Sequence, residues 1–155
     1  MPDSIPTDSL GVMICGHGSR SVAAVDEFHT LFVGIGRSEV SLYASHYLGP
    51  QSGRPLAEIR AALAALGLAR QPGSSEFEDH ISVMLETMRM LVAGDAERAP
   101  AAIGEQRGFF ERYVAPWAFE CCTAIRDSSV ASYYRRVAQF ADCFLALERD
   151  SLAME

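Results

Sequence analysis

The 155-residue sequence lacks any apolar run long enough to cross a membrane. Its longest runs, such as Val12 to Cys15 and Ala61 to Leu66, fall far short of the roughly 20 residues that a spanning helix needs. The first ten residues contain two acids, no basic residue and no apolar stretch, so they do not resemble a signal peptide. We therefore expect a cytoplasmic protein that is not inserted in a membrane.

The sequence also lacks a cluster of basic residues, and its formal net charge is -7. Nucleic-acid binding requires grouped cationic side chains that displace counterions from phosphates, so a nucleic-acid partner is not expected. Apolar residues make up 49% of the chain, which predicts one globular domain with a proper core. An acidic domain of this kind is better suited to a basic peptide.

Motifs for catalysis and metal binding are missing too. There is no phosphate-binding Gly-x-x-x-x-Gly-Lys, no nucleophile elbow, and no pair of histidines spaced for one helical face. The four cysteines do not show the Cys-x-x-Cys spacing of a zinc site, and we expect them to be reduced: Cys15, Cys121, Cys122 and Cys143. The sequence therefore predicts a protein that is not an enzyme and holds no metal ion or cofactor.

The segment from Ser75 to Val92 has the clearest pattern in the chain. Ser75 and Glu78 have the spacing of a capping box, which predicts that a helix begins at Ser75. Its apolar residues recur at intervals of three and four and form one stripe: Ile81, Met84, Leu85, Met88, Leu91 and Val92. Its polar face carries Glu76, Glu78, Asp79, His80 and Glu86. Acids at a helix start also have a purely structural interpretation, because they complement the helix dipole.

Similar periodicity predicts further helices and an all-α fold. One helix is expected from Pro55 to Leu66, ending at Gly67, and another from Glu105 to Arg112. Pro116 predicts a kink or short break at Val114 and Ala115, after which the helix continues to about Asp127. Ser128 or Ser129 is expected to cap a last helix that runs to about Asp150. Near the N-terminus, Phe28, Leu31 and Phe32 fit a helical face ended by Gly34 and Gly36.

Three motifs in this order resemble the TorD-like family of redox-enzyme maturation chaperones, over about residues 25–155. The first motif consists of Phe28, Leu31, Phe32 and Gly34 followed by Tyr43, Ser45, Tyr47 and Leu48. The second motif runs from Glu76 to His80 and includes Glu86. The third motif includes Phe109, Phe110, Pro116, Trp117 and Tyr134. Two positions depart from the family pattern. Phe77 replaces the usual proline, and Tyr113 replaces a histidine four residues before the tryptophan.

The resemblance implies a helical-bundle chaperone for a molybdoenzyme of the formate dehydrogenase or DMSO/TMAO reductase type. Such a chaperone binds the catalytic subunit and its twin-arginine leader peptide before cofactor insertion and export. By this resemblance, Glu76, Glu78, Asp79 and Glu86 would meet the arginines beside His80 and Ser45. Tyr43, Tyr47 and Trp117 would contact the apolar part of the leader.

Residues 1–24 differ from the rest and form an atypical leader segment. Gly11 to Cys15 has the character of a strand, and Gly16 to Arg20 reads Gly-His-Gly-Ser-Arg, which resembles the start of small CbiX-like tetrapyrrole chelatases. Two alternatives follow: a chelatase fragment that uses His17, or a helical interaction protein without a signal-peptide role. Because the chain is shortened at its N-terminus relative to the TorD-like family, we expect a homodimer in which a second copy covers exposed apolar faces, with exchange of helices as one route.

Overall fold

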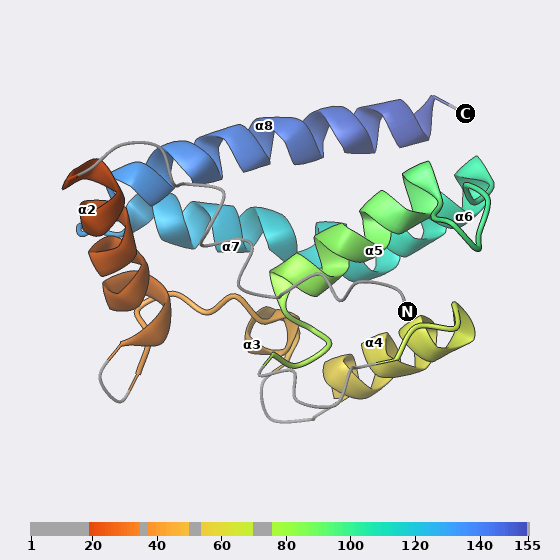
Figure 1. Cartoon of the computed structure of the whole chain (residues 1–155), viewed down its shortest axis with the longest axis horizontal. Helices are drawn as coiled ribbons and strands as arrows, with labels where there is room; N and C mark the ends of the chain where they lie inside the picture. The colour runs from red at the N-terminus through yellow and green to blue at the C-terminus, as the bar shows by residue number, and fades with distance from the viewer. Residues whose placement is uncertain (1–18, 35–36, 50–53, 70–75, 155) are drawn as a thin grey trace.

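The computed structural model describes residues 19–34, 37–49, 54–69 and 76–154. These residues form α-helices and two π-helical turns, with no strand beyond an isolated bridge between Tyr43 and His80. In chain order the elements are α2 (Ser19–Phe28), η1 (His29–Val33), α3 (Ala44–Leu48), α4 (Arg54–Ala65), α5 (Ile81–Ala93), α6 (Ile103–Phe109), η2 (Phe110–Val114), α7 (Ala115–Asp127) and α8 (Tyr133–Ala153). The predicted all-α fold is confirmed (Figure 1).

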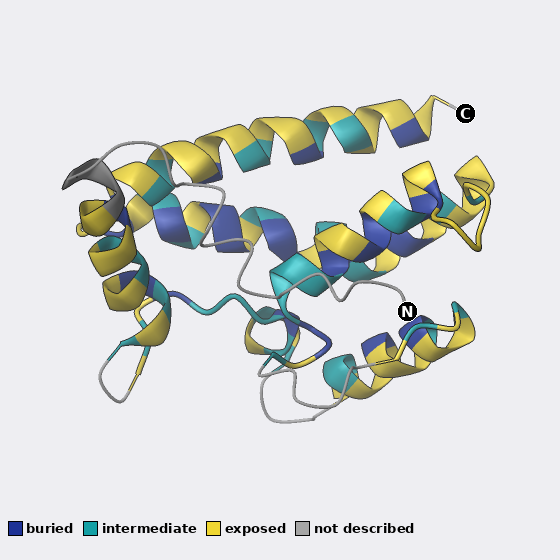
Figure 2. Ribbon diagram, in the orientation of Figure 1, coloured by how far each residue is buried: buried dark blue, intermediate teal, exposed yellow. Residues whose placement is uncertain are grey.

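Helix α7 forms the centre of the domain. Its buried residues recur at intervals of one, three and four, so they cover a wide apolar face: Trp117, Ala118, Cys121, Cys122 and Ile125. The long helix α8 lies along one side of α7, while α3 packs against α7 from another direction (Figure 1). The inward faces of α5 and α7 are buried, whereas much of α8 is exposed (Figure 2).

Helix α2 crosses the start of α8 at one end of the molecule (Figure 1). The rings of Phe28 and Phe32 lie 5.9 Å and 5.1 Å from the ring of Tyr134, so aromatic packing joins the two helices. The helical segment ends where predicted, at Gly34, whose φ of 62° is accessible mainly to glycine. A side chain at this position would also collide with the carbonyl of Arg37.

Pro116 predicts a kink or short break at Val114 and Ala115, and the structure has a π-helical turn that ends at Val114. Residues 110–114 form η2, and the amide of Ala115 donates to the carbonyl of Phe110, five residues back. Pro116 follows in the first turn of α7, where its missing N–H is tolerated. Helical structure therefore continues from α6 through η2 into α7 without a break.

Two predicted helix starts are wrong. Residues 76–80 are not helical and α5 begins at Ile81, because the acids of this segment bond to neighbouring segments and hold a turn; Ser75 itself lies outside the described residues. Helix α8 begins at Tyr133 rather than after Ser128 or Ser129. The amides at its start donate hydrogen bonds to the carboxylate of Glu27 in α2, so neither serine is needed as a cap.

The sequence features of residues 1–18, including the expected strand and His17, lie outside the part of the chain that the structure describes. Helix α2 runs without interruption across residues 24 and 25. Among the described residues, no helix is both long and apolar enough to cross a membrane, and no group of three or more His, Cys, Asp or Glu side chains is placed to hold a metal ion.

Candidate peptide-binding site

The structure brings together two of the segments that the sequence singled out. Tyr43 and His80 form an antiparallel bridge, in which the amide of Ala44 donates to the carbonyl of Asp79 at 3.0 Å. The amide of Ile81 donates to the carbonyl of Leu42 at 2.9 Å. Two segments that are distant in the chain are thus fixed side by side, immediately before α3 and α5.

Asp79 is the buried centre of this junction. Its side chain accepts a hydrogen bond from the amide of Ser45 at 3.0 Å, and the residue is 1% exposed. Because Ser45 lies in the first turn of α3, the carboxylate satisfies an amide that has no partner within that helix. Asp79 therefore holds the two segments together and is not available at the surface.

Glu76 and Tyr43 form a contact at the outer edge of the junction. The Tyr43 hydroxyl donates to the carboxylate of Glu76. The side chain of Glu76 is 33% exposed, which makes it the most accessible of the three acids in the turn. Burial, together with the hydrogen bond and charge of Glu76, raises the pKa of Tyr43 well above its usual range, so this hydroxyl remains a donor at physiological pH.

His80 caps α5 from within the same turn. Its Nδ1 accepts from the amide of Ser82 at 3.2 Å, which places the proton of the neutral ring on Nε2. Nε2 lies 3.9 Å from the carboxylate of Glu76. Burial lowers the pKa of His80 despite the opposing effects of Glu76 and Asp79, so the imidazole is neutral at pH 7.

Glu78 pairs with an arginine of the chain itself. Arg60 of α4 donates from Nε and Nη2 to the two carboxylate oxygens at 2.9 Å and 3.0 Å. The arginine side chain is 54% exposed, whereas that of Glu78 is 10% exposed. This two-point contact ties α4 to the turn, and it shows that the turn accommodates a guanidinium group.

Tyr47 and Trp117 stack on each other inside the domain. Their ring centroids are 5.8 Å apart and the planes are inclined by 25°. Trp117 is fully buried, and its Nε1 donates to the carbonyl of Tyr113 at 2.7 Å. Trp117 consequently cannot touch a surface ligand in this structure. It supports Tyr47, whose hydroxyl donates to the carbonyl of Ser41 at 2.7 Å.

Glu86 lies apart from the other predicted residues. It projects from the exposed side of α5, and its carboxylate accepts from Arg89, one turn further along, at 2.7 to 3.0 Å. The structure therefore brings Tyr43, Ser45, Glu76, Glu78, Asp79 and His80 into one junction. It stacks Tyr47 of α3 on the buried Trp117 of α7, and it leaves Glu86 on a neighbouring surface.

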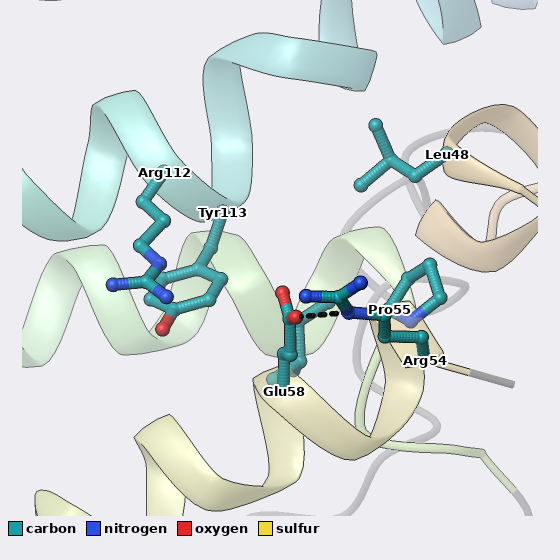
Figure 3. Close-up of a pocket in the computed structure, with 7 residues that line it drawn as sticks. Leu48, Arg54, Pro55, Glu58, Arg112 and Tyr113 are labelled. Atoms are coloured by element: carbon teal, nitrogen blue, oxygen red, sulfur yellow. Dashed lines mark hydrogen bonds and ion pairs between the residues drawn. The ribbon is translucent and has the colours of Figure 1, made fainter.

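A pocket of about 320 Å³ opens at the other end of α3 (Figure 3). It is lined by Leu48 of α3, by Arg54, Pro55, Glu58 and Ile59 of α4, and by Arg112 and Tyr113 of η2. Arg54 is paired with Glu58 at 2.9 Å, and the guanidinium of Arg112 lies over the ring of Tyr113. Two guanidinium groups and one carboxylate make this pocket unsuitable for an arginine pair.

Sequence reasoning missed Arg60 as part of the site. An arginine on the polar side of a short helix carries no local sign that it will reach Glu78, in a turn beyond the end of that helix. Tyr113 attracted attention only as a departure from a family pattern, although it lines the pocket and its carbonyl holds Trp117. Nothing in the sequence indicated that Ser41 and Leu42 take part, yet their carbonyls accept from Tyr47, Cys121 and Ile81.

Comparison with known families shows which family the chain resembles. The family model described as "Nitrate reductase delta subunit" matches residues 18–123, which include the junction, the pocket and Trp117. Neither the curated proteins nor the solved structures compared with the chain give a significant match.

Proposed function

Because the chain belongs to the nitrate reductase delta subunit family of NarJ/TorD-type chaperones, which assist redox-enzyme maturation, we propose that it binds the twin-arginine leader of a molybdoenzyme catalytic subunit. The client would be of the formate dehydrogenase or DMSO/TMAO reductase type. The chain would hold this subunit in the cytoplasm until its cofactor is inserted. The family is one of chaperones and not of catalysts, and the proposed activity is binding alone.

The observation that carries this proposal is the junction between the 43–47 segment and the 76–80 turn. Three carboxylates, those of Glu76, Glu78 and Asp79, gather there with one guanidinium and a neutral imidazole. The resulting charge is negative, which favours a cationic peptide. A carboxylate can accept several hydrogen bonds, so Glu76 can receive an arginine while it still accepts from Tyr43.

The contact between Arg60 and Glu78 supports an arginine site in particular. It is a two-point contact that a planar guanidinium makes and an ammonium cannot. We propose that one leader arginine binds Glu76 and that the second lies beside the pair formed by Glu78 and the half-exposed Arg60. The leader would then follow α3 toward Leu48, with Tyr43 and the exposed Phe77 contacting its apolar part.

The test is calorimetric titration of the full chain with a twin-arginine leader peptide and with its twin-lysine counterpart. Loss of two-point contacts should weaken binding of the lysine peptide about tenfold. Glu76→Gln should weaken binding of the arginine peptide by a similar factor, since the amide keeps an acceptor for Tyr43 and removes only the charge. Glu97→Gln, in an exposed connection away from the junction, is the matched control and should bind normally.

A separate variant asks how far the site extends. Glu86→Gln should leave affinity unchanged if the arginines bind only at the junction, and should weaken it if they also reach α5. Equal affinity for the two peptides would contradict the proposal. Tight binding to a folded client domain that has no leader would favour the alternative of a helical interaction protein.

A further inference from the structure

Helix α8 has a second apolar face that no other described element covers. This face, which we term the α8 seam, consists of Tyr133, Val137, Phe140, Phe144, Leu147 and Met154. Phe140 and Leu147 are 73% and 70% exposed. The rings of Phe140 and Phe144 stack on each other in solvent, with centroids 6.4 Å apart. The buried residues of α8 lie on a different face and are Ala138, Leu145 and Leu152. The helix packs against α7 and α6.

The spacing along the α8 seam is that of a coiled coil. Its residues follow each other at alternating intervals of four and three, with Ser151 filling the one polar position in the series. This repeat of about 3.5 residues keeps an apolar seam facing a partner helix over the full length of α8. The repeat predicts a partner that is itself a helix of similar length.

The charges beside the seam differ between its two ends. Arg136 flanks the first half, and it has no ion-pair partner among the described residues. Glu148 and Asp150 flank the second half. A helix with the opposite order of charges would complement this arrangement, and α8 itself has that order when its direction is reversed.

We propose that a second copy of this chain covers the α8 seam, with its own α8 antiparallel to the first. A two-fold axis near residue 142 would place Phe140 against Phe144 of the other copy and Val137 against Leu147. The same register sets Arg136 beside Asp150 of the other copy, twice by symmetry. A parallel pair would instead bring the two Arg136 ends together. This dimer is independent of leader binding, so either proposal can fail without the other.

Sedimentation equilibrium of the full chain should show a dimer at micromolar concentration. Phe140→Glu should raise the dissociation constant at least about 100-fold, because two apolar side chains leave the interface. Val92→Glu is the matched control, since Val92 is a 47% exposed apolar residue on α5, and this variant should remain dimeric. A monomeric parent chain, or a dimer unaffected by Phe140→Glu, would overturn the proposal.

A charge exchange tests the direction of the helices. Arg136→Glu alone and Asp150→Arg alone should each weaken the dimer about tenfold, since each replaces two attractive contacts with two repulsive ones. The double variant Arg136→Glu, Asp150→Arg should restore the parent dissociation constant. Additive weakening in the double variant would overturn the antiparallel arrangement.

Thiol cross-linking tests the position of the axis. Cys143 is exposed beside the seam, and in the proposed register it faces Cys143 of the other copy. The chain contains no lysine, so a short bismaleimide applied to a Cys15→Ser background will react with cysteine alone, and Cys121 and Cys122 are buried. A covalent dimer that disappears in Cys143→Ser is expected. A dimer by sedimentation that does not cross-link would overturn this register.

Discussion

The first amides of α5 and of α8 both donate hydrogen bonds to a side chain. The acceptor at α5 is close in the sequence, whereas the acceptor at α8 is far away in it. At α5 the capping side chain is His80, which accepts from the nearby amide of Ser82. At α8 the capping side chain is Glu27, which lies more than 100 positions earlier in the chain. Its carboxylate accepts from the amides of Ser132, Tyr133 and Tyr134 at 2.8 to 3.0 Å. The α5 cap belongs to the candidate site, whereas the α8 cap joins the two ends of the fold.

This difference shows how the acids near each helix are used. Around α5 the acids of the preceding turn hold other segments: Asp79 bonds α3 and Glu78 bonds α4. Around α8 the serines before the helix are not its caps, since Ser128 donates to Glu39 and accepts from Val130. A cap from the adjacent turn does not fix a helix relative to the rest of the fold. A cap from a distant residue also holds the helix against the element that carries that residue.

The largest effect is expected from Asp79→Ala. The change removes a buried carboxylate and leaves the Ser45 amide without its acceptor, which should cost about 2 to 3 kcal/mol of unfolding free energy. Urea denaturation followed by circular dichroism measures this cost. Asp79→Asn keeps an oxygen acceptor and should lose less. If the alanine variant lost no more than an ordinary surface substitution, about 0.5 kcal/mol, the junction would not depend on this carboxylate.

A smaller effect is expected from Glu27→Ala. Three amides at the start of α8 lose a charged acceptor, which should cost about 1 to 2 kcal/mol, the range of a strong helix cap. Although burial opposes ionisation, the three backbone hydrogen bonds lower the pKa of Glu27 below its usual value of 4.5. The stabilisation is therefore complete above pH 4.5 and is lost as pH falls through the lowered value.

Ser129→Ala is the control for this cap. If Glu27 supplies the cap, the exposed Ser129 contributes little and its variant should unfold within about 0.5 kcal/mol of the parent. If instead Ser129→Ala were as destabilising as Glu27→Ala, the cap would be local after all. Both variants are compared by the same urea titration at pH 7.

The smallest effect concerns the pH dependence at α5. Burial lowers the pKa of His80 in the folded chain, so between that lowered value and 6.5 the unfolded chain binds more protons. Stability should therefore fall as pH decreases below 6.5 and should not change with this group above it. His80→Asn keeps a good cap and removes the titration, so it should flatten this part of the profile.

The matched variant for this pH profile is His46→Asn, at an exposed histidine of α3. Because His46 is exposed and does not cap α5, this variant should keep the parent's fall in stability below pH 6.5, measured as unfolding free energy at each pH. An equal flattening by both variants would show that the slope does not arise from the buried cap of α5.

Much of the fold followed from periodicity, as α4, α7 and α8 show. Pro55, Gly67 and the stripe between them predicted α4 closely. The irregularity that Pro116 predicted at Val114 and Ala115 lies at the boundary between η2 and α7. These features depend on residues close together in the chain. The start of α8 was not predictable in this way, because its first amides donate to a distant residue, Glu27. The non-helical turn before α5 was not predictable either, because contacts with α3 and α4 hold it.

For the candidate site, the sequence indicated the residues but not their exposure. Asp79, Glu78 and Trp117 were expected to meet a ligand, and all three are buried. The sequence does not distinguish an acidic side chain that is free to bind a peptide from one that accepts a hydrogen bond from an amide of its own chain. Of the residues that the sequence indicated, Tyr43, Glu76 and His80 lie together at the edge of the junction, where we propose that a leader binds.

The π-helical turn at η2 sets the rotational phase of the helices on either side of it. One extra residue in this turn shifts everything beyond it by about 100° around the helix axis, relative to a uniform α-helix. The segment can thus present α6 to α5 and then α7 to α3 and α8. Deleting one residue between 110 and 114 would turn Trp117 away from Tyr47 and Cys121 away from Ser41, even though every side chain involved were kept.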